Sequence, residues 1–302
     1  MFIRSFLLGL LGVVCVKNLP FVWHLRFFYA LSRRLSKQET DGHAAAAHRL
    51  LLPAVMTTRS PPTECDFNMH KSNSTYFTDL DMSRAHLAGL LFSAMFMGTT
   101  QHGRCNLLVG AVACVFQREI KPQQTYELWT RVASWDDKWL YMITHFVVPS
   151  SRRQGRSVAC SSSQASWEKG AEKGESESPH DQPHGKNHQV LASAVTRMVF
   201  KKGRLTVTPA QAIAACHATA LLDAHGDTRD SGPIDTQFAS TTVSDEANCG
   251  CHESTRLDLE ALESLRKANL PIVQLHRGWD AVHALFDDTR DNVLARHQDL
   301  IF

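Results

Sequence analysis

The chain has 302 residues, of which 43% are hydrophobic, and a formal net charge of +2. This composition provides a packed core for one large domain or two modest ones, so a fibrous or wholly disordered protein is excluded. Charges of both signs are mixed and no basic stripe is present, so nucleic-acid binding is not expected. The eight cysteines lack the spacing of a disulfide framework, which predicts reduced thiols.

The first 37 residues are expected to form a hydrophobic membrane anchor (1–37). The apolar run 6–16 is short for a membrane-spanning helix, and Lys17 and Pro20 argue against one continuous helix. No suitable cleavage site follows, so a secretory signal peptide is the least favoured interpretation. A signal anchor and an interfacial hairpin in the headgroup region both remain open. The hairpin would be held by aromatic side chains at Trp23, Phe27, Phe28 and Tyr29.

The next segments predict a domain that mixes helices with antiparallel strands. A short apolar strand is expected from Leu51 to Thr58, where Pro61 and Pro62 follow. Between Ser74 and Met97, apolar residues recur every three or four positions, which predicts one long amphipathic helix. Four further strands are expected at 107–116, 125–133, 139–148 and 190–200. The residues alone therefore predict an α+β fold with an antiparallel sheet.

Two other regions have a different character. The segment 150–187 is dominated by Ser, Gly, Lys, Glu and His, which predicts a disordered insertion before the last strand. Beyond Pro209, helices are expected at 210–222, 257–268 and 278–297, with a polar connector at 223–255. We expect this C-terminal helical extension, 209–302, to cover the preceding domain or a partner.

A dense cluster of polar side chains precedes the long helix, at 64–76. A strand-to-helix connection lies at the positive end of the helix dipole, where an oxyanion is stabilised. Asp66 is a candidate general base or nucleophile, and His70 is a candidate for proton transfer. The alternative is that Asp66 only caps the loop or the helix and that His70 only packs. No Gly-x-Ser-x-Gly elbow is present, so a serine hydrolase is disfavoured.

Five of these residues form the pattern Asp-x-Asn-x-His-x-x-Asn-x-x-Tyr: Asp66, Asn68, His70, Asn73 and Tyr76. The pattern resembles the start of the central helix in hotdog-fold acyl thioesterases of the 4-hydroxybenzoyl-CoA thioesterase type. It is most similar to the branch of thioesterase superfamily member six and related fungal thioesterases. The resemblance covers roughly residues 50–210 and implies a hotdog domain at 50–208, in which a five-stranded antiparallel sheet wraps a long central helix.

The resemblance also implies an activity. The expected reaction is hydrolysis of a fatty acyl or polyketide thioester of coenzyme A or a carrier protein, in lipid or secondary metabolism. Asp66 and His70 would be catalytic, and no cofactor or metal is expected. The residues that would stabilise the oxyanion or shape the substrate site are Asn68, Asn73, Ser74, Thr75 and Tyr76.

The same resemblance implies a homodimer attached to the endoplasmic reticulum membrane, with its soluble part in the cytosol. Two other functions stay open. One is a non-catalytic hotdog protein that binds acyl chains or partners at the membrane. The other is a dehydratase or isomerase on the same fold.

Overall fold

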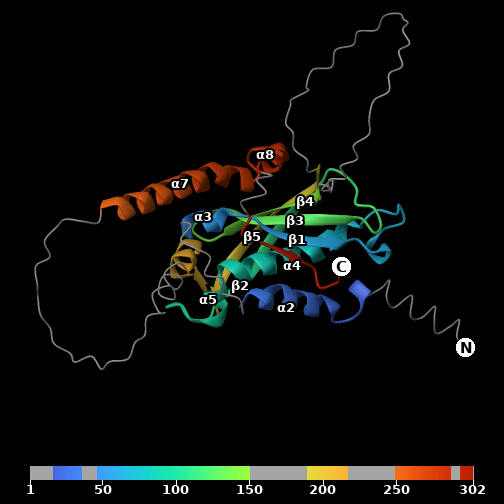
Figure 1. Ribbon diagram of the computed structural model, residues 1–302, viewed down its shortest axis with the longest axis horizontal. Coiled ribbons are helices and arrows are strands. Elements are labelled where there is room, and N and C mark those ends of the chain that lie inside the picture. Colours follow the sequence, from blue (N-terminus) through green and yellow to red (C-terminus); the bar gives the residue numbers. More distant parts are fainter. Residues whose placement is uncertain (1–15, 36–45, 150–188, 217–248, 287–292, 302) are drawn as a thin grey trace, which may run out of the picture.

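The computed structural model describes residues 16–35, 46–149, 189–216, 249–286 and 293–301. The expected insertion at 150–187, most of the expected connector and the apolar run before Val16 lie outside these residues. The described elements are stacked in layers (Figure 1): α7 and α8, then the sheet, then α4, and finally α2.

A single sheet forms the frame of the molecule. Its strands follow the order β2-β5-β4-β3-β1-β7, and β6 pairs with β5. The strands are β1 (Ala54–Arg59), β2 (Asn106–Phe116), β3 (Thr125–Trp135), β4 (Leu140–Val148), β5 (Gln189–Lys202), β6 (Leu205–Val207) and β7 (Ala295–Gln298). All neighbours are antiparallel except β7, which runs parallel to β1.

The first five strands confirm the sequence prediction, but the expectation of a five-stranded, wholly antiparallel sheet was wrong. A helix was expected to run as far as residue 297, yet residues 295–298 form β7. Their sequence, Ala-Arg-His-Gln, does not alternate apolar and polar residues as a half-buried strand usually does. The strand forms through backbone pairing to β1, which leaves no such pattern in the sequence. The strand β6 follows the turn at Gly203 and has only three residues. It is too short to show a repeating pattern of apolar residues, so it was not predicted either.

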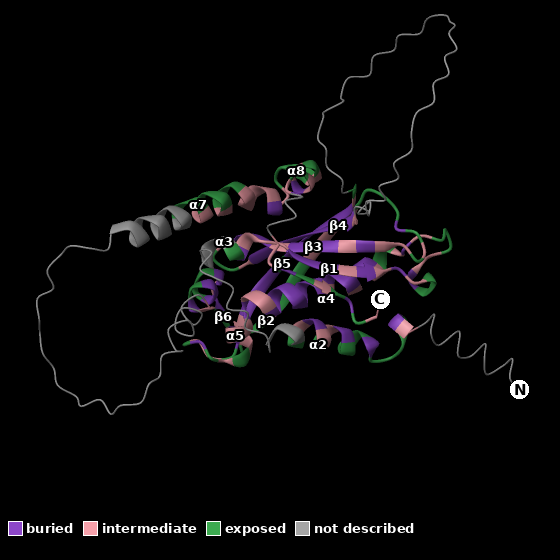
Figure 2. Ribbon diagram, viewed as in Figure 1, coloured by how far each residue is buried: buried purple, intermediate pink, exposed green. Residues whose placement is uncertain are grey.

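The central helix is α4 (Asn73–Leu91), and α5 (Ser93–Met97) follows it. The predicted single helix is broken at Phe92, whose φ of −124° and ψ of 22° are not helical. One face of α4 packs on the sheet, and α2 (Val22–Leu35) packs on the opposite side, so α4 is buried almost all round (Figure 2). The two helices approach closely at Gly89, where an added Cβ would lie 2.9 Å from the Leu31 carbonyl oxygen.

The helix α2 occupies the second half of the segment expected to form an anchor or interfacial hairpin, and the apolar run before Val16 lies outside the described residues. Of the four expected aromatic anchors, Phe28 and Trp23 are 61% and 37% exposed, whereas Phe27 packs against the core. Among the described residues, no helix combines the length and the apolar character needed to cross a membrane.

The C-terminal extension covers the other face of the sheet with α7 (Cys249–Val273) and α8 (Gly278–Ala284). The helix α7 begins within the expected polar connector, so that part of the prediction was wrong.

The helix α3 (Ala46–Leu51) ends where the first strand was expected to begin. A further helical segment at 209–216 matches the start of the helix expected at 210–222. Short 3-10 turns lie at Val16–Asn18 and Pro62–Glu64.

A buried polar bridge joins this extension to the sheet. Ser193 Oγ lies 2.8 Å from His145 Nδ1 and 2.6 Å from His283 Nδ1 on α8. Burial, with Arg131 and His283 nearby, lowers the pKa of His145 to about 3. This imidazole is therefore neutral near pH 7 and bridges the layers by hydrogen bonding.

Candidate active site

Asp66 lies in a tight turn that projects from the domain ahead of α4. Its Oδ1 accepts hydrogen bonds from the backbone N–H groups of Asn68 (2.9 Å) and His70 (3.3 Å). The backbone N–H of Asp66 donates to the His70 carbonyl oxygen at 2.8 Å. Asp66 therefore has the turn-capping role that the sequence left open. Among the described residues, no hydrogen bond engages its second oxygen, Oδ2, so the half-exposed carboxylate retains an acceptor for a substrate or a water.

The tip of this turn is apolar. Phe67 is 93% exposed and Met69 is 59% exposed. Met69 adopts a φ of 60°, a left-handed conformation that is uncommon for a residue other than glycine. Strain of this kind often marks functional loops. The turn thus presents two large apolar side chains beside the candidate carboxylate.

His70 and the start of α4 flank the turn. His70 is half-exposed, and its Nε2 lies 3.4 Å from Glu119 Oε2. Asn73 and Ser74 open the helix at the surface, where first-turn amides have no preceding turn to bond. The backbone N–H and hydroxyl of Thr75 both donate to the Ser72 carbonyl oxygen, at 2.9 and 2.7 Å. The amide of Thr75 is therefore already used, and Asn73 and Ser74 are the better candidate donors to an oxyanion.

Tyr76 points into the core and is only 2% exposed. Its ring lies 4.8 Å from the ring of Phe116 and 5.0 Å from that of Phe146, measured between centroids. Burial raises the pKa of its phenol, so the hydroxyl stays protonated. Tyr76 packs the base of the site, whereas Asn68 lies exposed on the turn.

A buried ionic network lies beneath the turn. Lys71, the residue after His70, places its Nζ 2.6 Å from Glu64 Oε2 and 2.9 Å from Asp79 Oδ2 on α4. Tyr126 on β3 donates to the same Asp79 oxygen. Burial opposes the charged form of Asp79, yet Lys71, Lys17 and Arg26 together hold the pKa of this carboxyl below its usual range. The network therefore fixes the candidate loop to the central helix through charges.

Both ends of the described chain complete the network. Arg26 on α2 lies 2.9 Å from Asp79 and 2.5 Å from Asp299, which follows β7. Asp299 Oδ2 also accepts a hydrogen bond from the Thr58 hydroxyl at 2.8 Å, and Lys17 Nζ lies 3.7 Å from the same oxygen. None of these pairings was predicted from the sequence. The signal was the acidic Asp79 within the apolar pattern of α4, but nothing local identifies its partner Arg26, 53 positions away, or the pairing of Arg26 with Asp299 across 273 positions.

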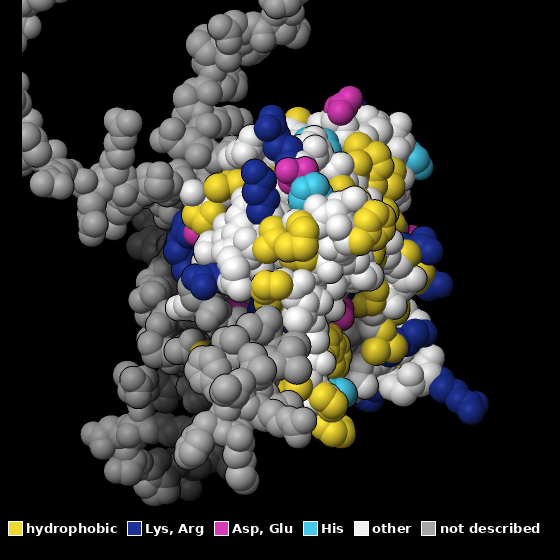
Figure 3. Space-filling model, turned by 90° about the vertical axis from the view of Figure 1, so that its right-hand side faces the viewer, with side chains coloured by type: hydrophobic (Ala, Val, Ile, Leu, Met, Phe, Trp, Pro, Cys, Tyr) yellow, Lys and Arg dark blue, Asp and Glu magenta, His cyan; other side chains and the backbone are white. Residues whose placement is uncertain are grey.

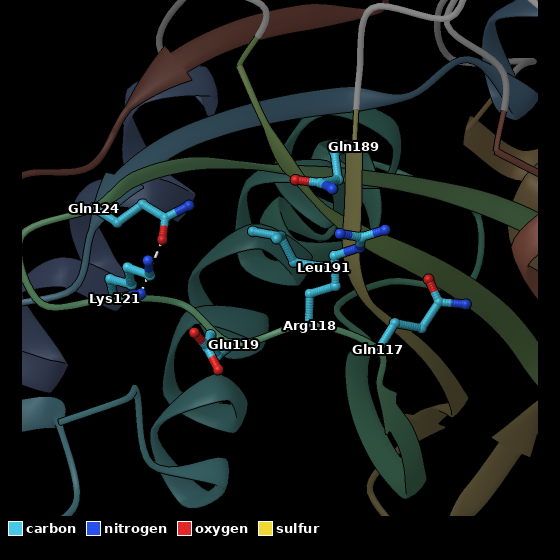
Figure 4. Close-up of a pocket in the computed structure, with 7 residues that line it drawn as sticks. All are labelled: Gln117, Arg118, Glu119, Lys121, Gln124, Gln189 and Leu191. Carbon is cyan, nitrogen blue, oxygen red and sulfur yellow. Dashed lines mark hydrogen bonds between the residues drawn. The ribbon is translucent and has the colours of Figure 1, made fainter. Parts of the chain in front are cut away.

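An open hollow lies beside the turn, with a volume of about 690 Å³ (Figure 4). Its lining is mostly polar: Gln117, Arg118, Glu119, Lys121, Gln124, Gln189 and Leu191. Two contacts join its rim to the turn: the His70–Glu119 pair, and a 2.8 Å hydrogen bond from the Lys71 N–H to the Ile120 carbonyl oxygen. The volume falls within the range of small-molecule sites. This hollow was not predicted from the sequence.

Comparisons with known proteins agree on one family. The sequence model of the thioesterase-like superfamily matches residues 60–209. Thioesterase poxG of Penicillium oxalicum is 36% identical over 214 residues, covering 66% of this chain and 65% of that protein. Probable thioesterase atnL of Emericella nidulans is 34% identical over 221 residues, covering 66% of this chain and 67% of that protein. The chain thus spans slightly less than two-thirds of poxG.

Solved structures include a more distant match. The crystal structure of YbaW, a probable thioesterase from Escherichia coli, is 10% identical to this chain, with a TM-score of 0.37. The match covers 54% of this chain and 95% of that one.

Proposed function

We propose that this chain, which belongs to the thioesterase-like superfamily, hydrolyses acyl thioesters with Asp66 as the reacting carboxylate. The observation that carries the proposal is the position of Asp66. Its carboxylate is half-exposed, its Oδ2 accepts no hydrogen bond from the described residues, and its turn comes just before Asn73 and Ser74, which open the buried helix α4. A carboxylate and nearby oxyanion donors are the two groups that acyl transfer to water needs.

In the hydrolysis, Asp66 takes a proton from a water molecule as the water oxygen attacks the thioester carbon. The carbonyl oxygen becomes an oxyanion, which the amides of Asn73 and Ser74 stabilise. Collapse of this intermediate breaks the carbon–sulfur bond, and the protonated Asp66 returns the proton to the thiolate. Direct attack by Asp66 through an acyl anhydride requires the same carboxylate and stays open as the second mechanism. His70 is the candidate that assists proton transfer.

The proposed substrate is a fatty acyl or polyketide thioester of coenzyme A or a carrier protein, with a role in lipid or secondary metabolism. Apolar side chains support a hydrophobic acyl group. Phe67 and Met69 are exposed on the turn, and Phe77 and Phe116 are 38% and 37% exposed nearby in the fold. Figure 3 views this end of the molecule and shows hydrophobic side chains interspersed with basic ones.

A thioester series tests the activity. Purified protein is incubated with acyl-CoA substrates of increasing chain length, and thiol release is measured. We expect hydrolysis with a preference for one range of chain lengths. A 3-hydroxyacyl-CoA is included with product analysis, because a dehydratase would release water and an enoyl thioester without free thiol. Binding without turnover of any thioester would favour the non-catalytic alternative and contradict the proposal.

We propose a homodimer formed through β2. This strand ends the sheet, and among the described residues it pairs only with β5. Leu108 and Val109 on it are 49% and 46% exposed, and an apolar edge strand is a surface for pairing with another chain. Light scattering is expected to give a dimer mass, which the double variant Leu108→Lys, Val109→Lys lowers to a monomer. The control Leu205→Lys, at a 71% exposed position on β6, should remain dimeric, and a monomeric wild type would refute the interface.

We also propose attachment to a membrane, at the endoplasmic reticulum with the folded domain in the cytosol. The outer side of α2 supports it, because Leu25 and Phe28 on the helix are 60% and 61% exposed and Phe21, just before it, is 76% exposed. A helix with such an apolar side can lie in the headgroup region. Wild-type protein should float with lipid vesicles, and a variant with serine at these three positions should float less. Failure of the wild type to float would end the proposal.

A further inference from the structure

The hollow beside the turn is built on a firmly held loop. The backbone N–H groups of Gln117 and Arg118 both donate to the Leu191 carbonyl oxygen of β5, at 2.9 Å. At the other end of the loop, Gln123 donates to the Ser60 carbonyl oxygen at 2.6 Å. The backbone N–H of Lys121 donates to the Gln124 side-chain oxygen at 2.8 Å, drawn as the dashed line in Figure 4. The loop that carries the basic side chains is therefore fixed before any ligand arrives.

The two basic residues of the hollow lack acidic partners in the part of the chain that the structure describes. With its amide oxygen turned toward the guanidinium, Gln189 accepts from Arg118 Nη1 at 2.8 Å and Nε at 3.1 Å. This partner is neutral, so it orients the guanidinium without cancelling its charge. Lys121 is exposed on the same rim. The single carboxylate in the lining, that of Glu119, instead faces His70.

Such a hollow suits a phosphate group. A guanidinium offers a planar fork of donors that matches phosphate oxygens, and an ammonium adds a mobile point charge. The side-chain amides of Gln117 and Gln124 supply further donors from the lining. Because the hollow is open and polar, an acyl chain would gain little from entering it. Its chemistry therefore differs from that of the apolar turn.

We propose that Arg118 and Lys121 bind the phosphate of the leaving group, that is, the phosphopantetheine that coenzyme A and acyl carrier proteins share. This inference rests on the proposed thioesterase function. The turn links the two sites, because the His70 N–H bonds Asp66 and the His70 ring faces Glu119 on the rim of the hollow. A substrate can then place its thioester at Asp66, its acyl chain on the apolar turn and its phosphate in the hollow.

The test compares one acyl group on coenzyme A, on a carrier protein and on pantetheine, which lacks the phosphate. The variant carries Arg118→Gln and Lys121→Gln. Charge-assisted hydrogen bonds contribute enough that we expect KM to rise about 10-fold to 100-fold for a phosphate-bearing substrate, with kcat changed less than about twofold. KM for acyl-pantetheine should not change. The control Arg204→Gln, on the exposed turn at the opposite end of β5, should behave as wild type.

The outcomes separate this inference from the function on which it rests. A KM increase with acyl-CoA alone or with the carrier protein alone supports phosphate binding and identifies the natural source. An equal increase for acyl-pantetheine, or no increase for any substrate, overturns the phosphate site while hydrolysis stands. If the wild type hydrolyses none of them, the proposed function fails, and calorimetric binding of coenzyme A decides the phosphate site. Equal affinity of wild type and variant would then refute it.

Discussion

Replacing Asp66 by Asn is expected to lower kcat/KM for the preferred acyl thioester by about 10²-fold to 10⁴-fold, the usual contribution of a positioned general base. An amide cannot accept the proton of the attacking water, and it is a poor nucleophile, so the result is the same for both mechanisms. Thiol release under subsaturating substrate measures the loss. The variant tests the catalytic role separately from the structural one. Its side-chain oxygen can still accept the hydrogen bonds that the N–H groups of Asn68 and His70 donate to Oδ1 in the wild type.

The matched control is Asp66→Ala, which removes the acceptor as well as the charge. Two backbone N–H groups at the surface then lose their partner to water, so this variant should lose about 0.5–1.5 kcal/mol of unfolding free energy, whereas Asp66→Asn should lose much less. Activity should be low in both variants. If Asp66→Asn is as active as the wild type and only Asp66→Ala is impaired, then Asp66 is a turn cap and another group carries the reaction.

The parts of the fold that the sequence predicted correctly depend on local periodicity. The central helix and the first five strands each repeat their apolar residues over at least one full element, because each packs on a neighbouring layer. The strand β7 has no such pattern. It is defined by parallel pairing of Ala295 with Ala54, which lie 241 positions apart. A single sequence carries no local signal for such a pairing.

The candidate site also has parts that local sequence predicts and parts that it does not. The turn around Asp66 was predicted because its residues are consecutive and match a known pattern. The hollow was missed because it joins the loop 117–124 to Gln189, across two strands and the insertion. The ionic network was not predicted, because a charged residue can be expected in the core only when its oppositely charged partner is known, and these partners are far apart in the sequence. In the sequence, Arg26 looked like one more residue of an interfacial segment, whereas it is almost fully buried against α4.

Arg26 is for this reason the position where we expect the largest loss of stability. The variant Arg26→Met preserves much of the side-chain length but leaves Asp79 and Asp299 without their shared guanidinium. Removing one member of a buried ionic network leaves uncompensated charge, and the expected cost is about 3–5 kcal/mol of unfolding free energy. Urea unfolding followed by circular dichroism measures it. The control Leu25→Met, one position along on the exposed side of α2, should change the unfolding free energy by less than about 0.5 kcal/mol.

A double-mutant cycle with Asp299→Asn decides whether the charges act together. Removing the negative charge of Asp299 relieves part of the penalty in Arg26→Met, so the combined loss should be at least about 1 kcal/mol smaller than the sum of the single losses. Strict additivity would mean that Arg26 stabilises α2 by packing alone. Coupling would instead show that α2 and the segment after β7 hold the central helix through one set of charges. Since Asp79 also binds Lys71, the same charges then position the turn that carries Asp66.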